Sequence, residues 1–210
     1  MRPTPRLEGW WERRFASDLQ QAKNGEHELV FVGDSITQGW GGPGKAVWQE
    51  LFAPRNAINL GASGDRTQNV LWRLDNGLTD ALADAARAAV VMIGTNNATH
   101  GEATSAEIAA GVEAVVQRLL DGLPNARVLL LGIFPRGDET PAKRCRAVNA
   151  MLAERFRGHD RVVYRDIGDH FVKPGEPIDR AVMPDLLHLS KAAYRTWAEA
   201  ILADVDALLR

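Results

Sequence analysis

A serine follows directly on an apolar segment near the start of the chain. Residues 29–32 read Leu-Val-Phe-Val, which predicts a buried strand, and they continue into Gly33, Asp34 and Ser35. In open α/β sheets, ligands bind at the carboxyl ends of the strands, so Ser35 would stand at the mouth of a crevice. A serine hydroxyl attacks a carbonyl group only when a base takes its proton and donors stabilise the oxyanion. Ser35 is therefore a candidate nucleophile, provided that the chain supplies both.

Histidine is the commonest general base, and the chain contains five histidines. His188 lies three residues after Asp185, just before the last predicted helix. In a turn, this spacing lets the Asp185 carboxylate reach Nδ1 of the imidazole while Nε2 faces a serine. The alternative is that Asp185 only caps a turn and His188 packs. Asp166 and His170 follow another predicted strand, so His170 is an alternative base.

Two further strand ends carry residues suited to hold an oxyanion. Residues 61–65 read Gly-Ala-Ser-Gly-Asp, and small residues let a backbone N–H group approach a ligand closely. Residues 94–97 read Gly-Thr-Asn-Asn and offer a side-chain amide donor. Each segment by itself is more typical of a tight strand-to-helix turn, where glycine and asparagine are favoured in any case.

The elements that must position these residues alternate between strands and helices. Apolar runs predict strands at residues 29–33, 57–60, 89–93, 128–134 and 162–166. Helical periodicity predicts an amphipathic helix that ends near Asn24 and further helices at 47–52, 67–76, 105–121, 141–157 and about 191–209. Strands that are apolar on both faces are typical of a parallel sheet covered by helices on both sides. We expect one α/β domain over residues 1–210, with the helix of residues 1–25 packed on it.

Composition excludes several classes of function. The chain has 210 residues, a formal net charge of -2 and 25% charged residues, and no basic run marks a nucleic-acid-binding surface. No stretch approaches the ~20 apolar residues that span a bilayer, and no signal peptide is visible, so we expect a cytoplasmic protein. Cys145 is the only cysteine, which excludes an intrachain disulfide and a thiolate cluster. We expect neither a cofactor nor a metal ion.

Four segments, in this order, resemble the conserved blocks of the SGNH (GDSL) hydrolase superfamily. Residues 33–35 resemble the nucleophile block, Gly64 the glycine block, Asn96 the asparagine block, and residues 185–188 the final Asp-x-x-His block. The stretches 64–74, 131–137 and 186–190 are similar to the platelet-activating-factor acetylhydrolase-like branch. The resemblance covers most of the chain and implies a flavodoxin-like, three-layer α/β/α domain. Its five-stranded parallel sheet would have the order 2-1-3-4-5, with the switch point between the first and third strands.

The resemblance also implies a role for each matching residue. Ser35 would be the nucleophile, His188 the base and Asp185 the group that orients the base. The backbone N–H groups of Ser35 and Gly64, with the Asn96 side chain, would form the oxyanion hole.

Other residues near these blocks are candidates for contact with the substrate. Asp34, Trp40 and Arg136 are our candidates for binding it. Ser63 departs from many relatives, which carry glycine there, and its side chain would narrow the acyl site or bond within it. Residues 39–45 fit the phosphate-loop pattern G-x-x-x-x-G-K, but Ala46 follows where Ser or Thr would hold magnesium, and the strand ends too early.

The sequence thus predicts a cofactor-independent serine esterase that works through an acyl-enzyme. Resemblance to the acetylhydrolase branch implies a short acyl group, acetyl above all, on a sugar, a glycan or a lipid-like alcohol. The alternatives are a thioesterase or lysophospholipase for longer acyl chains and a catalytically silent binding module. Relatives in this branch form dimers, so a homodimer is an additional expectation.

Overall fold

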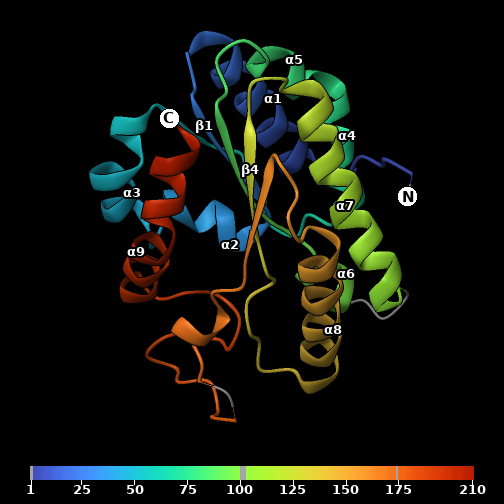
Figure 1. The fold of residues 1–210 in the computed structure, drawn as a ribbon, viewed down its shortest axis with the longest axis vertical. Coiled ribbons are helices and arrows are strands. Elements are labelled where there is room, and N and C mark those ends of the chain that lie inside the picture. Colours follow the sequence, from blue (N-terminus) through green and yellow to red (C-terminus); the bar gives the residue numbers. More distant parts are fainter. Residues whose placement is uncertain (1, 100–102, 174) are drawn as a thin grey trace.

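A five-stranded parallel sheet forms the centre of the molecule (Figure 1). The computed structural model describes residues 2–99, 103–173 and 175–210. The strands are β1 (Leu29–Gly33), β2 (Ala57–Asn59), β3 (Ala88–Met92), β4 (Arg127–Leu131) and β5 (Val162–Arg165). Their order in the sheet is β2-β1-β3-β4-β5, which confirms the predicted class and order.

From β1, the next strand in the chain, β2, is added on one side of the sheet, and the later strands β3, β4 and β5 are added on the other side. Leu29 of β1 pairs with Ala57 of β2 on one side and with Ala88 of β3 on the other. The carboxyl ends of β1 and β3 therefore flank the switch point, where open α/β sheets bind ligands. Two short helices begin at these ends, α2 (Ser35–Gln38) and α6 (Thr95–Thr99).

Helices cover both faces of the sheet (Figure 1). One face packs against α3 (Lys45–Leu51) and α9 (Lys191–Leu208), drawn at the left. The opposite face is covered by α1 (Gly9–Asn24), α4 (Thr67–Arg73), α5 (Thr79–Leu82), α7 (Ser105–Gly122) and α8 (Glu139–Arg155). Short 3-10 turns occupy Gly39–Gly41, Ala53–Arg55 and Gly168–His170, and a π turn occupies Leu74–Leu78.

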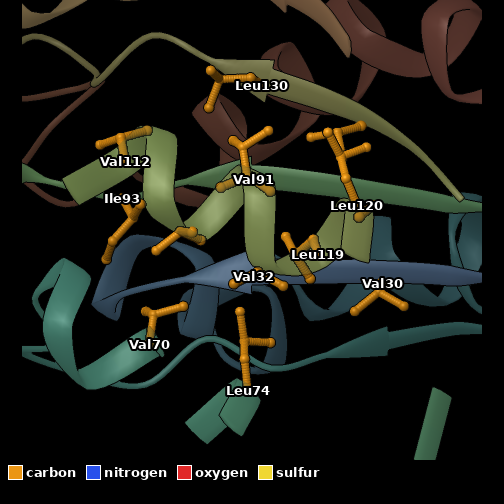
Figure 2. Close-up of a cluster of buried hydrophobic side chains, with 14 of the residues drawn as sticks. Val30, Val32, Val70, Leu74, Val91, Ile93, Val112, Leu119, Leu120 and Leu130 are labelled. Atoms are coloured by element: carbon orange, nitrogen blue, oxygen red, sulfur yellow. The ribbon is translucent and has the colours of Figure 1, made fainter. Parts of the chain in front are cut away.

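Alternate residues of β1 enter the two cores, because successive side chains of a strand point to opposite faces. Val30 and Val32 pack with Val91 of β3 and with side chains of α4 and α7 (Figure 2). Leu29 and Phe31 point to the other core, beneath α3 and α9. Both faces of the strand are buried, as a parallel sheet covered on two sides requires.

Two predicted elements differ from the structure for local reasons. The predicted helix 67–76 ends as an α-helix at Arg73, because Gly77 takes a φ of 108° in the π turn that joins α4 to α5. The predicted strand 128–134 ends at Leu131. Beyond it, the Asn149 side chain pairs with both the N–H and the C=O of Ile133, at 2.8 and 3.0 Å, and replaces a neighbouring strand.

Helix α1 packs through an aromatic cluster. Trp11 is buried, and its ring lies 5.4 Å from Trp72 of α4, centroid to centroid. Phe15 lies 5.1 Å from the same Trp72 ring. Within residues 2–99, 103–173 and 175–210, none of the helices combines the length and apolar character that crossing a bilayer requires.

Candidate active site

Ser35 is the first residue of α2, immediately after β1. The Asp34 side chain caps this helix by accepting a hydrogen bond of 3.0 Å from the Ile36 N–H. Gly33 allows the tight transition, because a Cβ atom there would collide with the Thr37 hydroxyl and with a carbonyl oxygen of β3. As the first helical residue, Ser35 has a backbone N–H with no acceptor inside the helix.

Ser35, His188 and Asp185 form a continuous hydrogen-bonded chain. Nε2 of His188 lies 2.9 Å from Oγ of Ser35, although 153 positions separate the two residues. Nδ1 of the same imidazole lies 2.6 Å from Oδ2 of Asp185. An imidazole held in this way can accept a proton on the nitrogen that faces the serine.

Asp185 also shapes the turn that carries His188. Its Oδ1 accepts hydrogen bonds from the N–H groups of Leu187, at 3.1 Å, and His188, at 2.7 Å. Leu186 reaches a left-handed φ of 63°, which closes this turn. Burial raises the pKa of the Asp185 carboxyl, but the bonds from His188 and Leu187 outweigh it and lower the pKa to about 2. Asp185 is therefore an anion wherever a histidine base is neutral.

The loop after β2, here called the glycine loop (residues 61–65), brings Gly64 to the carboxyl-end edge of the sheet. The Asp65 N–H donates to the Ala62 carbonyl at 3.1 Å, and Gly64 takes a φ of 73° in the turn between them. The Ser63 N–H donates to Oε1 of Gln38, at 2.6 Å, which ties the loop to α2.

Asn96 lies on α6 and reaches across to the glycine loop. Its Nδ2 donates to the Asp65 carbonyl at 2.9 Å, which leaves the second hydrogen of this amide group for another acceptor. The neighbouring Asn97 accepts from the Thr67 N–H at 3.0 Å, so α6 is bonded to the start of α4 as well. Hydrogen bonds from Asn96 and Asn97 therefore join α6 to the segment that runs from the glycine loop into α4.

A groove of about 400 Å³ opens beside Ser35. This volume suits a small ligand. Glycines and polar side chains dominate its lining, which consists of Arg14, Ser35, Gln38, Gly39, Gly41, Gly42, Pro43 and Ser63.

The structure buries the side chains of two residues that we predicted as substrate contacts. Trp40 is 0% exposed, and its ring packs 4.7 Å from Tyr194 and 4.8 Å from Trp197 in the core under α9. Asp34 is also 0% exposed and caps α2 through Ile36 instead of facing the groove. Neither side chain reaches a substrate in this arrangement.

Arg136 supports α6 instead of opening onto the groove beside Ser35. Its Nη1 donates to Oγ1 of Thr95, at 3.0 Å, and to Oγ1 of Thr99, at 2.6 Å. Its Nη2 pairs with Asp138 at 2.8 Å. Arg136 borders a separate cavity of about 620 Å³ next to α8, and Ser35 does not line that cavity.

The alternative base does not meet the serine. His170 is exposed in its 3-10 turn, and the Asp166 carboxylate accepts from Nδ2 of Asn149 and from the Gly168 N–H, each at 3.0 Å. Asp166 thus bonds to α8 through Asn149 and stabilises the turn that follows β5 through Gly168. The structure brings His188, and not His170, to Ser35.

Sequence reasoning missed the side chains that hold the glycine loop. Gln38 lies in the nucleophile segment, but no pattern there indicates that its amide pairs with Ser63. Trp11 donates through Nε1 to Oδ1 of Asp65 at 2.6 Å, although its helical spacing predicted only an apolar face. Among the described residues, no group of three or more His, Cys, Asp or Glu side chains is arranged to hold a metal ion.

Comparison with known proteins assigns the chain to a family. The model of the GDSL-like Lipase/Acylhydrolase family matches residues 31–196, a span that runs from β1 into α9. The chain belongs to this family. As a GDSL-like acylhydrolase it is a carboxylic ester hydrolase, which sets aside the alternative of a silent binding module.

Its curated relatives and structural neighbours agree with this assignment. Platelet-activating factor acetylhydrolase IB subunit alpha1 from Homo sapiens is 37% identical over 209 residues, which cover 95% of this chain and 86% of the relative. A GDSL-like lipase from Bacteroides thetaiotaomicron has the same fold, with a TM-score of 0.71, 16% identity and coverage of 92% and 97%. A catalytic mutant of an acetylxylan esterase from Geobacillus stearothermophilus matches with a TM-score of 0.64, 19% identity and coverage of 85% and 94%.

Proposed function

We propose that this GDSL-like acylhydrolase is a short-acyl serine esterase that works through an acyl-enzyme. The observation that carries the proposal is the chain from Oγ of Ser35 to the imidazole of His188, at 2.9 Å, and on to Asp185, at 2.6 Å. This arrangement supplies a nucleophile, a base within reach of its proton and a carboxylate that fixes the tautomer of the base.

In the proposed reaction, Oγ of Ser35 attacks the ester carbonyl carbon while its proton moves to Nε2 of His188. The tetrahedral intermediate breaks its bond to the alcohol oxygen, which takes the proton from His188 and leaves. A water molecule then attacks the acyl carbon while His188 accepts its proton, and His188 returns this proton to Oγ of Ser35 as the bond from the acyl carbon to Oγ breaks and the carboxylic acid is released. Asp185 remains ionised and stabilises the imidazolium in both steps.

The oxyanion of each tetrahedral intermediate would be held by three donors. These are the backbone N–H groups of Ser35 and Gly64 and the side-chain amide of Asn96. Support comes from the position of Ser35 as the first residue of α2 and from the bond of Asn96 to Asp65, which holds α6 to the glycine loop. Donors that are fixed before reaction stabilise charge with little reorganisation.

The groove beside Ser35 favours a short acyl group and a hydrophilic alcohol. A long alkyl chain needs an apolar lining, and among the described lining residues Pro43 is the main apolar side chain. Gln38, Ser63 and Arg14 instead offer polar groups. An acetyl ester of a sugar or of another hydroxylated alcohol fits this lining, and the acetylhydrolase and acetylxylan esterase names among the similar proteins agree.

The serine mechanism is tested by Ser35→Ala. The variant lacks the attacking oxygen, so hydrolysis of p-nitrophenyl acetate should fall by at least ~10³-fold. Ser17→Ala, an exposed change on α1, is the matched control and should retain wild-type turnover. Covalent labelling by a fluorophosphonate should follow the same pattern. Wild-type turnover by the Ser35 variant would refute the mechanism.

The acyl preference is tested with p-nitrophenyl esters of increasing chain length. We expect kcat/KM to be highest for acetate and to decline beyond butyrate, because no large apolar side chain is among the described residues that line the groove. A maximum at octanoate or longer would instead support the thioesterase or lysophospholipase alternative.

A homodimer belongs to the same proposal. The support is the name of the human relative, which is a subunit of a larger enzyme. Light scattering coupled to size-exclusion chromatography should give twice the 23.0 kDa mass of the chain. A monomeric mass at micromolar concentration would contradict this part of the proposal.

We further propose that the enzyme acts in the cytoplasm. Its one cysteine, Cys145, is buried and unpaired, as suits a reducing compartment. Fractionation of the source cells should recover the protein with cytosolic markers, and recovery with secreted proteins would refute the location.

A further inference from the structure

The segment before α1 lies against the loop that carries Gly64. Nη1 of Arg6 donates to the Ser63 carbonyl at 2.7 Å. The backbone of the same segment is fixed at Thr4, whose N–H donates to the Gln68 carbonyl and whose carbonyl accepts from Nδ2 of Asn69, each at 3.0 Å. An arginine from the start of the chain is thereby held at the glycine loop.

The Arg6 guanidinium is held on three sides. Its Nη2 donates to Glu8 at 2.6 Å, and its Cζ lies 5.1 Å from the centre of the Trp10 ring. The third side is Gly64, where a Cβ atom would come within 2.5 Å of Nη1. A glycine at position 64 therefore admits Arg6 as well as the positive φ of the turn.

The bond to Ser63 determines the direction of the next amide group. A trans peptide is planar, so the Ser63 C=O and the Gly64 N–H point in opposite directions. Because Arg6 holds the carbonyl oxygen on its own side, the Gly64 N–H is directed away from Arg6. Gly64 supplies one of the three donors of the proposed oxyanion hole.

The charged Arg6 donor on the Ser63 carbonyl oxygen also makes the Gly64 N–H a stronger hydrogen-bond donor. Hydrogen bonds in a chain polarise one another, and a guanidinium is a stronger donor than a neutral group. The peptide between Ser63 and Gly64 is polarised by Arg6 in the sense that makes the Gly64 hydrogen more positive. This effect would favour the negatively charged transition state over the neutral ester.

Each neighbouring peptide of the loop has its own support. Gln38 accepts from the Ser63 N–H and fixes the preceding peptide, and the Asp65 N–H donates to the Ala62 carbonyl and fixes the following one. Arg6 is the side chain bonded to the peptide in between. The glycine loop is therefore held at three successive peptide groups, between residues 62 and 65.

We propose that Arg6 is a positioning residue for the oxyanion hole, acting through the Ser63–Gly64 peptide. The inference rests on the proposed function, because it assumes that the Gly64 N–H binds the oxyanion. It makes the segment before α1 a part of the catalytic apparatus.

The test compares Arg6→Met with Arg13→Met, which removes an exposed arginine from α1. For Arg6→Met we expect kcat on p-nitrophenyl acetate to fall about tenfold, less than the 10²–10³-fold typical when a donor itself is lost. KM should change less than twofold, because the ester ground state carries no oxyanion. Arg13→Met should match the wild type, and Arg6→Lys, which retains a cation and a donor, should lie between Arg6→Met and the wild type.

A transition-state mimic separates positioning from folding. A trifluoromethyl ketone adds to a serine hydroxyl and forms an oxyanion, so its Ki should rise in Arg6→Met by the factor by which kcat/KM falls. Circular dichroism melting and active-site titration with a fluorophosphonate correct both numbers for unfolded enzyme.

The inference is overturned if Arg6→Met keeps kcat within twofold after that correction, or if kcat falls while the Ki of the ketone is unchanged. Failure of the proposed function looks different, because Ser35→Ala would then remain active. An inactive Ser35→Ala beside a fully active Arg6→Met refutes only the role of Arg6.

Discussion

At the scale of single residues, Asp34 and Asp185 show that the surroundings of a carboxyl group decide whether its pKa rises or falls. Burial raises the pKa of Asp34 to about 7, and the hydrogen bond from the Ile36 N–H does not compensate. At Asp185, the bonds from His188 and Leu187 outweigh burial and lower the pKa to about 2. The first carboxyl is suited to a structural role in its neutral form, and the second to supporting a histidine that becomes charged.

The raised pKa of Asp34 predicts a pH-dependent stability. Between pH about 4 and about 7 the folded protein binds more protons at Asp34 than the unfolded chain, so this group stabilises the fold less as the pH rises. Asp34→Asn keeps an acceptor for the Ile36 N–H and cannot ionise. We therefore expect the free energy of unfolding of Asp34→Asn, relative to the wild type, to rise between pH 5 and pH 8 in urea titrations.

Comparing the wild type with Asp34→Asn also controls for the titration of other buried carboxyl groups. Burial also raises the pKa of Asp18, to about 6, and that of Asp65, but these groups remain in both proteins and largely cancel in the difference. Parallel stability profiles for the wild type and Asp34→Asn would show that Asp34 does not titrate in this range.

At the scale of elements, the backbone of α2 packs directly against the loop that follows β2, with no side chain between them at Gly61. A Cβ atom at Gly61 would fall within 2.6 Å of the backbone carbonyl carbon of Thr37 and closer still to the backbone nitrogen of Gln38. Tyr194 of α9 donates to the Ile36 carbonyl at 2.6 Å and holds α2 from the other side. This close packing fixes Ser35 at the end of β1.

Gly61→Ala should therefore destabilise the fold, because the atoms it meets are backbone and cannot rotate away. We expect a loss of about 2–3 kcal/mol in the free energy of unfolding. Gly41→Ala is the matched control, since a Cβ atom at Gly41 meets nothing within 4 Å, and its effect should stay within about 1 kcal/mol. Equal stability of the two variants would contradict this account of α2.

At the scale of the whole molecule, a buried ion network joins α1, the glycine loop and α4. Arg73 is 1% exposed, and its guanidinium lies 3.1 Å from Asp18 of α1 and 3.1 Å from Asp65. It also donates to the Leu60 carbonyl at the end of β2. These contacts lead us to propose that α1 unfolds together with the sheet as one domain.

Arg73→Met tests this network. Loss of the guanidinium removes the arginine paired with buried Asp65 and one of the two arginines paired with buried Asp18, which should cost about 3–5 kcal/mol. Arg195→Met removes an arginine from an exposed pair with Glu50 and should cost less than about 1 kcal/mol. Unfolding followed by tryptophan fluorescence and by far-ultraviolet circular dichroism should give one coincident transition. Two separate transitions would refute the single domain.

Local patterns in the chain were sufficient for the architecture. Apolar strands alternating with periodic helices predict a parallel α/β sheet, because both signals depend on neighbouring residues alone. The ends of elements were less accurate where one distant side chain decides them, as Asn149 does at Ile133. The order of the strands came from the resemblance and not from these patterns.

The sequence by itself determined which residue types are available for the chemistry: a serine at a strand end, a histidine after an aspartate, and small or amide residues in two turns. Only the tertiary structure decided that His188 and not His170 meets Ser35, that Trp40 is buried, and that Arg6 reaches Ser63. The physical reason is that burial and hydrogen-bond partners depend on segments that fold together from distant parts of the chain. The direction of one peptide group, on which the oxyanion hole depends, has no signature in the local sequence.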